Sequence, residues 1–158
     1  MMRLVKPGET EQLRQLLIDS YSFDYDLNEG YKADILDVES RLQTSNNYVI
    51  EEDGELVATV SVPYEGEKVT EQSLPDEMDF RQLAVSPKHR RKGYASQIIK
   101  NLENIARKRG YKKLMLVTGP EMETAQSLYI ALGFKQPKER ETYIPAFGIT
   151  LLIFIKEL

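Results

Sequence analysis

The segment from Ser86 to Ser96, SPKHRRKGYAS, has the residue types and order of an anion-binding turn. Three consecutive cations, Arg90, Arg91 and Lys92, come directly before Gly93, and an amphipathic helix pattern follows. The start of a helix offers backbone N–H groups without partners and the positive end of the helix dipole. A glycine in the turn lets a phosphate approach that backbone closely. The segment therefore predicts a site for a phosphate-bearing ligand.

The elements on either side of this turn must position it. An apolar strand pattern covers residues 78–85, the helix pattern covers 95–109, and a second strand pattern covers 113–117. A strand, a helix and a strand in this order form a right-handed crossover, which makes the two strands parallel. Asp53-Gly54 lies between two further strand patterns and predicts an antiparallel hairpin. The predicted sheet is therefore mixed.

The remaining patterns complete a chain of alternating strands and helices. The final apolar run, residues 149–155, fits either a central strand or a dimer interface. The other predicted elements are strands at 2–6, 48–51, 56–62, 140–144 and 149–155, and helices at 10–21, within 22–46 and at 124–132. No repeat and no linker interrupts them, so residues 1–158 are expected to form one α/β domain.

Length and composition narrow the function. The chain of 158 residues has the size of one domain. It has no cysteine and a single histidine, His89, so neither a thiolate nor a histidine metal site is expected. The first residues, MMRLVKPG, lack the apolar stretch of a signal peptide. The longest apolar run has seven residues, whereas about 20 are needed to cross a bilayer. A cytoplasmic protein without a membrane partner is expected.

Positive and negative residues are concentrated in different parts of the sequence. Residues 86–113 contain ten Lys or Arg and one acid, a net charge of +9. Residues 19–79 contain 17 acids and three cations, a net charge of −14. Solvated surfaces would explain this division, and so would an anionic ligand near the first segment and a cationic amine near the second. Nucleic acid is not an expected partner, because no aromatic-rich basic strand accompanies the cations.

The chain resembles the GCN5-related N-acetyltransferase (GNAT) superfamily in two motifs. Residues 90–95, RRKGYA, fit its acyl-CoA motif Arg/Gln-x-x-Gly-x-Gly/Ala, after a strand that ends LAVSP. Residues 125–134, AQSLYIALGF, fit its Ala-x-x-Leu-Tyr-x-x-x-Gly-Phe signature. Many members carry Asn seven residues before that tyrosine, where this chain has Met122. The resemblance implies a single-domain fold with a mixed, mostly antiparallel sheet, a splayed parallel strand pair at its centre and flanking helices.

The resemblance also implies the acyl donor, acetyl-CoA, and the residues that hold it. The backbone N–H groups from Arg91 to Ser96 would cradle its pyrophosphate. The strand before the turn would contact the pantetheine arm. The implied donor-binding residues are Leu83, Ala84, Val85, Arg90, Arg91, Lys92, Gly93, Tyr94, Ala95 and Ser96.

Catalysis in the family is direct transfer of the acyl group to an amine through a tetrahedral intermediate. The resemblance implies that the N–H of Leu83 stabilises the oxyanion and that Tyr129 protonates the leaving thiolate. Tyr129 also lies on an apolar helix stripe, where a core role is the ordinary reading. Asp79, four residues before Leu83, is a candidate base or a solvated strand-end carboxylate.

Several alternatives stay open. The expected acceptor is a small-molecule amine or an amine of a protein or peptide, with residues 22–46 and 63–77 and their tyrosines as pocket walls. The main alternative is a catalytically inactive acyl-CoA-binding regulatory module. A nucleotide binder is remote, because the turn lacks both glycine-rich nucleotide fingerprints. A homodimer is compatible with the sequence.

Overall fold

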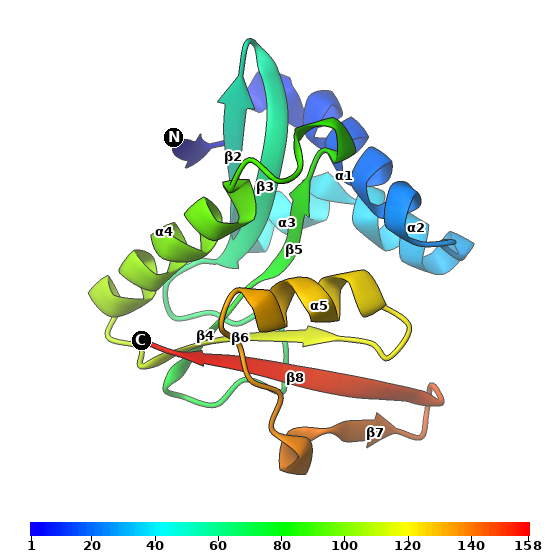
Figure 1. The fold of residues 1–158 in the computed structure, drawn as a ribbon, viewed down its shortest axis with the longest axis vertical. Coiled ribbons are helices and arrows are strands. Elements are labelled where there is room, and N and C mark those ends of the chain that lie inside the picture. Colours follow the sequence, from blue (N-terminus) through cyan, green and yellow to red (C-terminus); the bar gives the residue numbers. More distant parts are fainter.

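The computed structural model describes residues 1–158 as two four-stranded sheets joined by one continuous segment (Figure 1). One sheet has the strand order β1-β2-β3-β5, and the other has the order β4-β6-β8-β7. The strands are β1 (Met2–Leu4), β2 (Ser45–Glu52), β3 (Glu55–Pro63), β4 (Glu77–Asp79), β5 (Arg81–Val85), β6 (Lys113–Thr118), β7 (Thr142–Ile144) and β8 (Ile149–Glu157). The mixed, mostly antiparallel α/β fold predicted from the sequence is confirmed.

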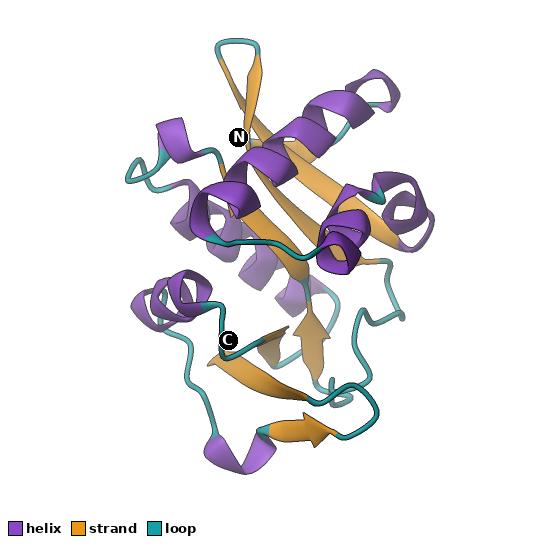
Figure 2. Cartoon of the chain, turned by 90° about the vertical axis from the view of Figure 1, so that its right-hand side faces the viewer, coloured by secondary structure: helices purple, strands orange, loops and turns teal.

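Helices cover both faces of the first sheet (Figure 2). The helices α1 and α3 contact β2, β3 and β5, and α4 packs against β3 and β5 with a different set of side chains. The helices are α1 (Thr10–Asp24), α2 (Glu29–Leu36), α3 (Val38–Thr44), α4 (Tyr94–Lys108) and α5 (Glu123–Ala131), with short 3-10 turns at Pro7–Glu9, Pro87–His89 and Lys138–Arg140. None of them is long and apolar enough to cross a bilayer.

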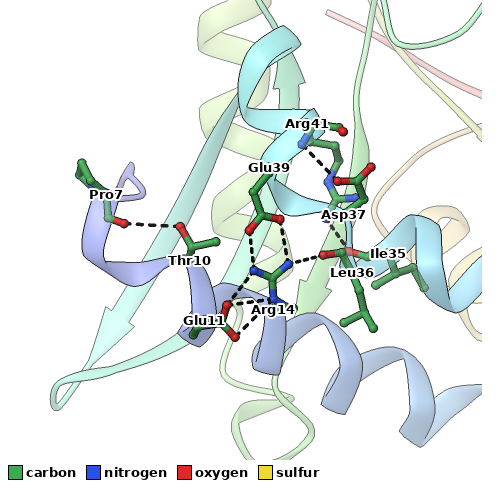
Figure 3. A network of polar contacts seen from close by, with 10 residues as sticks. Pro7, Thr10, Glu11, Arg14, Ile35, Leu36, Asp37, Glu39 and Arg41 are labelled. Atoms are coloured by element: carbon green, nitrogen blue, oxygen red, sulfur yellow. Dashed lines mark hydrogen bonds and ion pairs between the residues drawn. The ribbon is translucent and has the colours of Figure 1, made fainter.

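The acidic region within residues 22–46 forms two short helices, where the sequence indicated one. Arg14 of α1 holds them in place (Figure 3). Its guanidinium bonds both carboxylate oxygens of Glu39, at 2.7 and 3.0 Å, and the carbonyl oxygen of Leu36. The side chain of Asp37 accepts from Ser40 N and caps the start of α3. Capping groups and one arginine thus stabilise helices that are too short to be stable alone.

The segment predicted as one strand over 78–85 is divided between the two sheets. β4 pairs in parallel with β6, and the last bond between them runs from Phe80 N to Met115 O, at 3.3 Å. Beyond Phe80, the chain pairs antiparallel with β3 instead. Only the first part of this segment therefore pairs with β6, and β5 then diverges from it, which is the splayed parallel pair that the resemblance implies.

A β-bulge follows the division at once. Ser61 pairs with Arg81 and Thr59 with Ala84, so two β5 residues, Gln82 and Leu83, lie opposite the single Val60. Gln82 has φ 58°, a left-handed conformation that is uncommon for a residue with a side chain. Backbone outliers of this kind persist where the surrounding structure determines them, and they concentrate at functional sites.

Aromatic side chains fill the junction of the two sheets. Phe80 is 2% exposed, and its ring centroid lies 6.1 Å from that of Tyr129 and 6.2 Å from that of Phe134, both edge to face. β8 lies between β6 and β7 and buries Phe154 against Tyr129. The apolar run of residues 149–155 is therefore accounted for by an internal strand of the second sheet.

Candidate active site

The turn between β5 and α4 presents six consecutive backbone N–H groups without partners. From Arg91 to Ser96, no N–H donates a hydrogen bond within the protein; the first helical bond runs from Gln97 N to Gly93 O, at 3.0 Å. Gly93 has φ 84°, and no atom lies within 4 Å of the position a Cβ would take. The arrangement offers an anion several converging donors, the positive end of a helix and open space in front of the glycine.

The three cations of the turn have different surroundings. Arg90 forms a two-pronged ion pair with Asp24 at the end of α1, at 2.7 and 2.9 Å, and its Nε donates to Val85 O. Lys92 lies 3.4 Å from Glu52 of the β2–β3 hairpin. Arg91 has no bond to the protein and a positive φ of 64°. Arg91 is therefore the one cation of the turn that is free to meet a phosphate directly.

Glu52 also organises the turn from the hairpin side. Its carboxylate accepts a 2.7 Å hydrogen bond from the Tyr94 hydroxyl and lies 3.7 Å from His89 Nε2. The hydrogen bond from Tyr94, followed by the charge of Lys92, holds the pKa of Glu52 below its ordinary value. The Tyr94 side chain thus positions the turn, while its backbone N–H remains available to a ligand.

A cavity of about 610 Å³ runs from this turn into the space where β5 and β6 diverge. Its volume is in the range of ligand sites. The residues of the predicted donor site that line it are Leu83, Ala84, Val85, Arg90, Arg91, Gly93, Tyr94, Ala95 and Ser96. Lys92 does not line the cavity. Residues of β5 and β6 supply the central walls of the cavity, and residues of α5 supply another. Figure 1 shows the ribbons of these three elements.

Tyr129 lies on α5 and lines the cavity although it is only 6% exposed. Its ring packs edge to face on Phe134, with 5.4 Å between centroids, and its hydroxyl has no hydrogen-bond partner in the protein. Burial raises the pKa of the Tyr129 phenol well above its ordinary value of 10. The structure is thus compatible with both roles considered from the sequence. The Tyr129 ring packs in the core, and Tyr129, with a protonated hydroxyl, also lines the cavity.

Asp79 lies outside the cavity. It is 1% exposed, and its Oδ2 accepts hydrogen bonds from Val69 N and Thr70 N, both at 2.9 Å, and from Ser73 Oγ, at 2.5 Å. These bonds hold the loop between β3 and β4. The other carboxylate oxygen, Oδ1, is buried without a hydrogen-bond partner. The role of Asp79 as a base stays a prediction.

Tyrosines in and directly after α1 and in α2 form another wall of the cavity, next to the turn of residues 90–96, here called the donor turn. Tyr21, Tyr25 and Tyr31 line the cavity, whereas residues 63–77, the other predicted wall, do not. The ring centroid of Tyr21 lies 6.2 Å from that of Tyr25 and 6.3 Å from that of Tyr31. Burial raises the pKa of Tyr21 well above its ordinary value, and burial followed by nearby phenols and acids raises the pKa of Tyr31 to about 12. The wall is therefore uncharged at neutral pH.

Tyr25 also replaces a missing helix cap. The side chain of Met122, at the N-cap of α5, makes no capping hydrogen bond. The N–H of Ala125, three residues later, donates instead to the Tyr25 hydroxyl, at 2.9 Å. An N-cap side chain ordinarily satisfies this N–H. The departure from the family's usual Asn at position 122 is thus compensated by a residue at the end of α1.

Three polar residues of the cavity were not singled out in the sequence. Arg81, Gln82 and Asp34 all line it. Arg81 and Gln82 were hidden within an otherwise apolar strand pattern, where an arginine is itself an unusual residue. Asp34 was one acid among many in its region.

Comparisons with known proteins agree with this geometry. Among solved structures, the chain superimposes on PaiA N-acetyltransferase from Thermoplasma acidophilum, solved in complex with coenzyme A, with a TM-score of 0.74 and 16% identity over 100% of this chain and 98% of that one. It superimposes on the ribosomal-protein-S18-alanine N-acetyltransferase from Escherichia coli with a TM-score of 0.67 and 18% identity, covering 99% and 92%. At these identities the likeness establishes the fold.

Curated relatives share more sequence over shorter stretches. N-acetyltransferase 8 of Rattus norvegicus is 31% identical over 100 residues, 60% of this chain and 41% of the relative. The [Ribosomal protein bS18]-alanine N-acetyltransferase of Haemophilus ducreyi is 36% identical over 74 residues, 47% of this chain and 51% of the relative. The chain thus spans about half the length, or less, of these relatives.

The family comparison covers most of the chain and includes the whole site. The "Acetyltransferase (GNAT) family" matches residues 10–134, which run from the tyrosine wall through the donor turn to the end of the Tyr129 helix. Together with the splayed strands and the six free N–H groups, this match shows that the chain belongs to the GNAT acetyltransferase family.

Proposed function

We propose that this protein transfers an acetyl group from acetyl-CoA to a primary amine. The observation that carries the proposal is the run of six partnerless N–H groups at one end of a cavity that passes between diverging strands to Tyr129. Two neighbouring folds of the family were solved with CoA or acetyl-CoA bound, which supports the choice of donor. A relative that acts on an alanine of ribosomal protein bS18 supports an amine as acceptor.

The residues present fit an acyl-CoA. The N–H groups from Arg91 to Ser96 would hold the pyrophosphate, with Arg91 as the available side-chain cation. The open space at Gly93 lets the phosphates approach the backbone. The apolar lining from Leu83 to Val85 suits the pantetheine arm, and the edge of β5 beyond the bulge faces no strand on the β6 side. The thioester would then lie near Leu83 and Tyr129.

The proposed reaction needs three contributions from the protein. The acceptor ammonium first loses a proton to solvent, and the neutral amine attacks the thioester carbonyl carbon. A C–N bond forms, the C–S bond breaks, and the nitrogen loses a second proton to solvent to give the amide. We assign the N–H of Leu83 to the oxygen that becomes negative during the attack. We assign the Tyr129 phenol to the departing sulfur, to which it gives a proton that solvent later replaces. The third contribution is the tyrosine wall, which adds no charge of its own beside the acceptor.

The proposal is tested by binding and by transfer. Isothermal calorimetry should detect acetyl-CoA binding, and a hundredfold excess over its Kd should stabilise the protein by about 2.7 kcal/mol, whereas ATP and NAD should have no such effect. Incubation with an amine panel should release free CoA thiol and yield acetylated amine by mass spectrometry. Binding without transfer to any amine would favour the regulatory module instead. Absence of binding would contradict both.

A further inference from the structure

Two arginines that line the cavity have no partner in the protein. Seven of the nine arginines bond a carboxylate or a carbonyl oxygen. The two exceptions are Arg91, on the donor turn, and Arg81, at the start of β5. The Nε of Arg81 is buried without a hydrogen-bond partner, and the residue lines the cavity. A guanidinium in such a place ordinarily receives a planar oxyanion.

A second arginine, Arg41, is influenced by the charge of Arg81. Arg41, 3% exposed, donates to the carbonyl oxygens of Asp34 and Ile35 and is bonded to no carboxylate. Burial, and to a lesser extent the like charge of Arg81, hold the pKa of Arg41 below its ordinary value. Asp34 also lines the cavity, but it lies beyond ion-pair distance of both guanidinium groups. Neither of these two cations is paired with a carboxylate.

A second group beside Arg81 also lacks a partner. The Oε1 of Gln82 is buried and accepts no hydrogen bond, and the residue lines the same cavity. A buried acceptor without a donor is unfavourable unless a ligand supplies one. An amine N–H is such a donor. Arg81 and Gln82 are adjacent, and Leu83, which we place at the thioester, is the next residue.

The charge of the cavity also argues against a purely cationic acceptor. Its lining includes two acids, Asp24 and Asp34, and three arginines, Arg81, Arg90 and Arg91. Asp24 is neutralised by Arg90. Many acids of the −14 segment are likewise paired at the surface or bonded in loops, among them Glu39, Glu52 and Asp79. The acidic half of the sequence therefore does not become an acidic acceptor site.

We infer that Arg81 binds a carboxylate of the acceptor, so that the acceptor is a free amino acid or a similar small amino-carboxylate. The inference rests on the proposed acetyl transfer and specifies its substrate class. The guanidinium of Arg81 holds the carboxylate in a two-pronged bond, and Gln82 Oε1 accepts from the amine. The Cα atoms of Arg81 and Leu83 are about 7 Å apart at most, and both residues line the same cavity, so the inference places the acceptor carboxylate and amine in one continuous site.

The wild-type protein provides the first test. The L-amino acids, β-alanine and γ-aminobutyrate are compared with their carboxamides and with an alanine-initiated peptide amide, at saturating acetyl-CoA. At least one amino acid should exceed its own carboxamide in kcat/KM by about 10- to 100-fold, mainly through KM, as expected for a charged hydrogen-bonded pair. Carboxamides or the peptide amide acetylated as well as the acids would overturn the inference while leaving the proposed function intact. No transfer to any of these amines would overturn the inference, whereas the proposed function would be overturned only if the wider amine panel also gave no transfer.

The variants Arg81→Met and Arg91→Met provide the second test, because both remove an arginine without a partner. Arg81→Met should abolish the preference for the acid over the carboxamide, and Arg81→Lys should restore part of it. Arg91→Met should weaken acetyl-CoA binding and keep the preference. Thermal unfolding of each variant verifies that it is folded. An unchanged preference in folded Arg81→Met would overturn the inference.

Discussion

At the scale of single residues, the site depends on side chains whose surroundings fix their protonation and their partners. Tyr129 is held by Phe80, Phe134 and Phe154, which set its ring while its hydroxyl stays without a protein partner. A buried phenol with a raised pKa keeps its proton at neutral pH. These surroundings are those that a proton donor to a thiolate requires.

Tyr129→Phe tests that role. The variant keeps the ring contacts and removes only the hydroxyl, so kcat should fall by about 100-fold or more while the Kd for acetyl-CoA changes less than about twofold. Steady-state kinetics and calorimetry measure the two quantities. Because burial raises the Tyr129 pKa, the wild-type rate should not decline on the alkaline side below about pH 10. An unchanged kcat in the folded variant would contradict the assignment.

At the scale of elements, the donor turn works through its backbone. Six N–H groups point out of a turn whose own cations are largely engaged elsewhere, by Asp24 and Glu52. Affinity for the donor should therefore depend on the path of the chain at Gly93 more than on the turn's Arg or Lys side chains.

Gly93→Ala and Gly66→Ala form a matched pair for this element. Both glycines have positive φ, 84° and 86°, and neither has an atom within 4 Å of the point that an alanine Cβ would occupy, so alanine should cost each fold about 1–2 kcal/mol. Only Gly93→Ala should also weaken acetyl-CoA binding, by about tenfold or more, because its methyl group occupies the approach to the backbone. Calorimetry measures the affinities. Equal affinities of the two variants for acetyl-CoA would contradict binding of its phosphates by the backbone around Gly93.

The junction of β1 with the first helix carries a pH-dependent contact. Glu9 bonds Arg3 at 2.8 and 2.9 Å and caps Lys6 N at 2.8 Å, and chiefly the bond with Arg3 lowers the pKa of Glu9 to about 2. A lowered pKa contributes stability that is complete above the unfolded value of about 4.3 and disappears as pH falls towards 2. Arg3 is partly exposed, which limits the contribution to about 1 kcal/mol.

Glu9→Gln should therefore lower the melting temperature by about 2–4 °C at pH 7. The difference from the wild type should shrink between about pH 4.3 and 2 and vanish below that. Thermal unfolding across this range measures it. Glu121→Gln, which changes an acid that forms no ion pair, is the control and should show no such trend. A constant difference at all pH values would show that the contact does not depend on the charge of Glu9.

At the scale of the whole molecule, two sheets share one chain segment and one aromatic junction. Phe80 ends the pairing of β4 with β6 and buries its ring between the sheets. Phe80→Ala should lower the free energy of unfolding by about 3–5 kcal/mol, because it leaves a cavity at the junction. Phe147→Ala, at a residue 76% exposed, should change it by less than about 0.5 kcal/mol. Denaturant unfolding compares the two, and similar effects would contradict the role of Phe80.

Local patterns in the sequence predicted most of this architecture. The hairpin at Asp53-Gly54, the turn at Gly93 and the helix that follows depend on neighbouring residues, and all appear in the structure. The division at Phe80 and the bulge at Gln82 depend on the pairing of distant strands, which no local pattern records. Simple alternation would place positions 79, 81 and 83 on one face. The division and the bulge break this alternation. Arg81 therefore lines the cavity, whereas Asp79 does not.

The end of α1 connects the binding of one substrate to the binding of the other. Asp24 forms an ion pair with Arg90 of the donor turn. The hydroxyl of the next residue, Tyr25, accepts a hydrogen bond from the first turn of α5, the helix that carries Tyr129. Tyr25 also belongs to the wall that faces the acceptor. The three connected parts are the donor turn, the start of α5 and the tyrosine wall. A ligand that orders one of them also orders the other two, so a second ligand loses less conformational entropy on binding. Donor and acceptor should thus help each other to bind, and thermodynamic reciprocity makes the help equal in both directions.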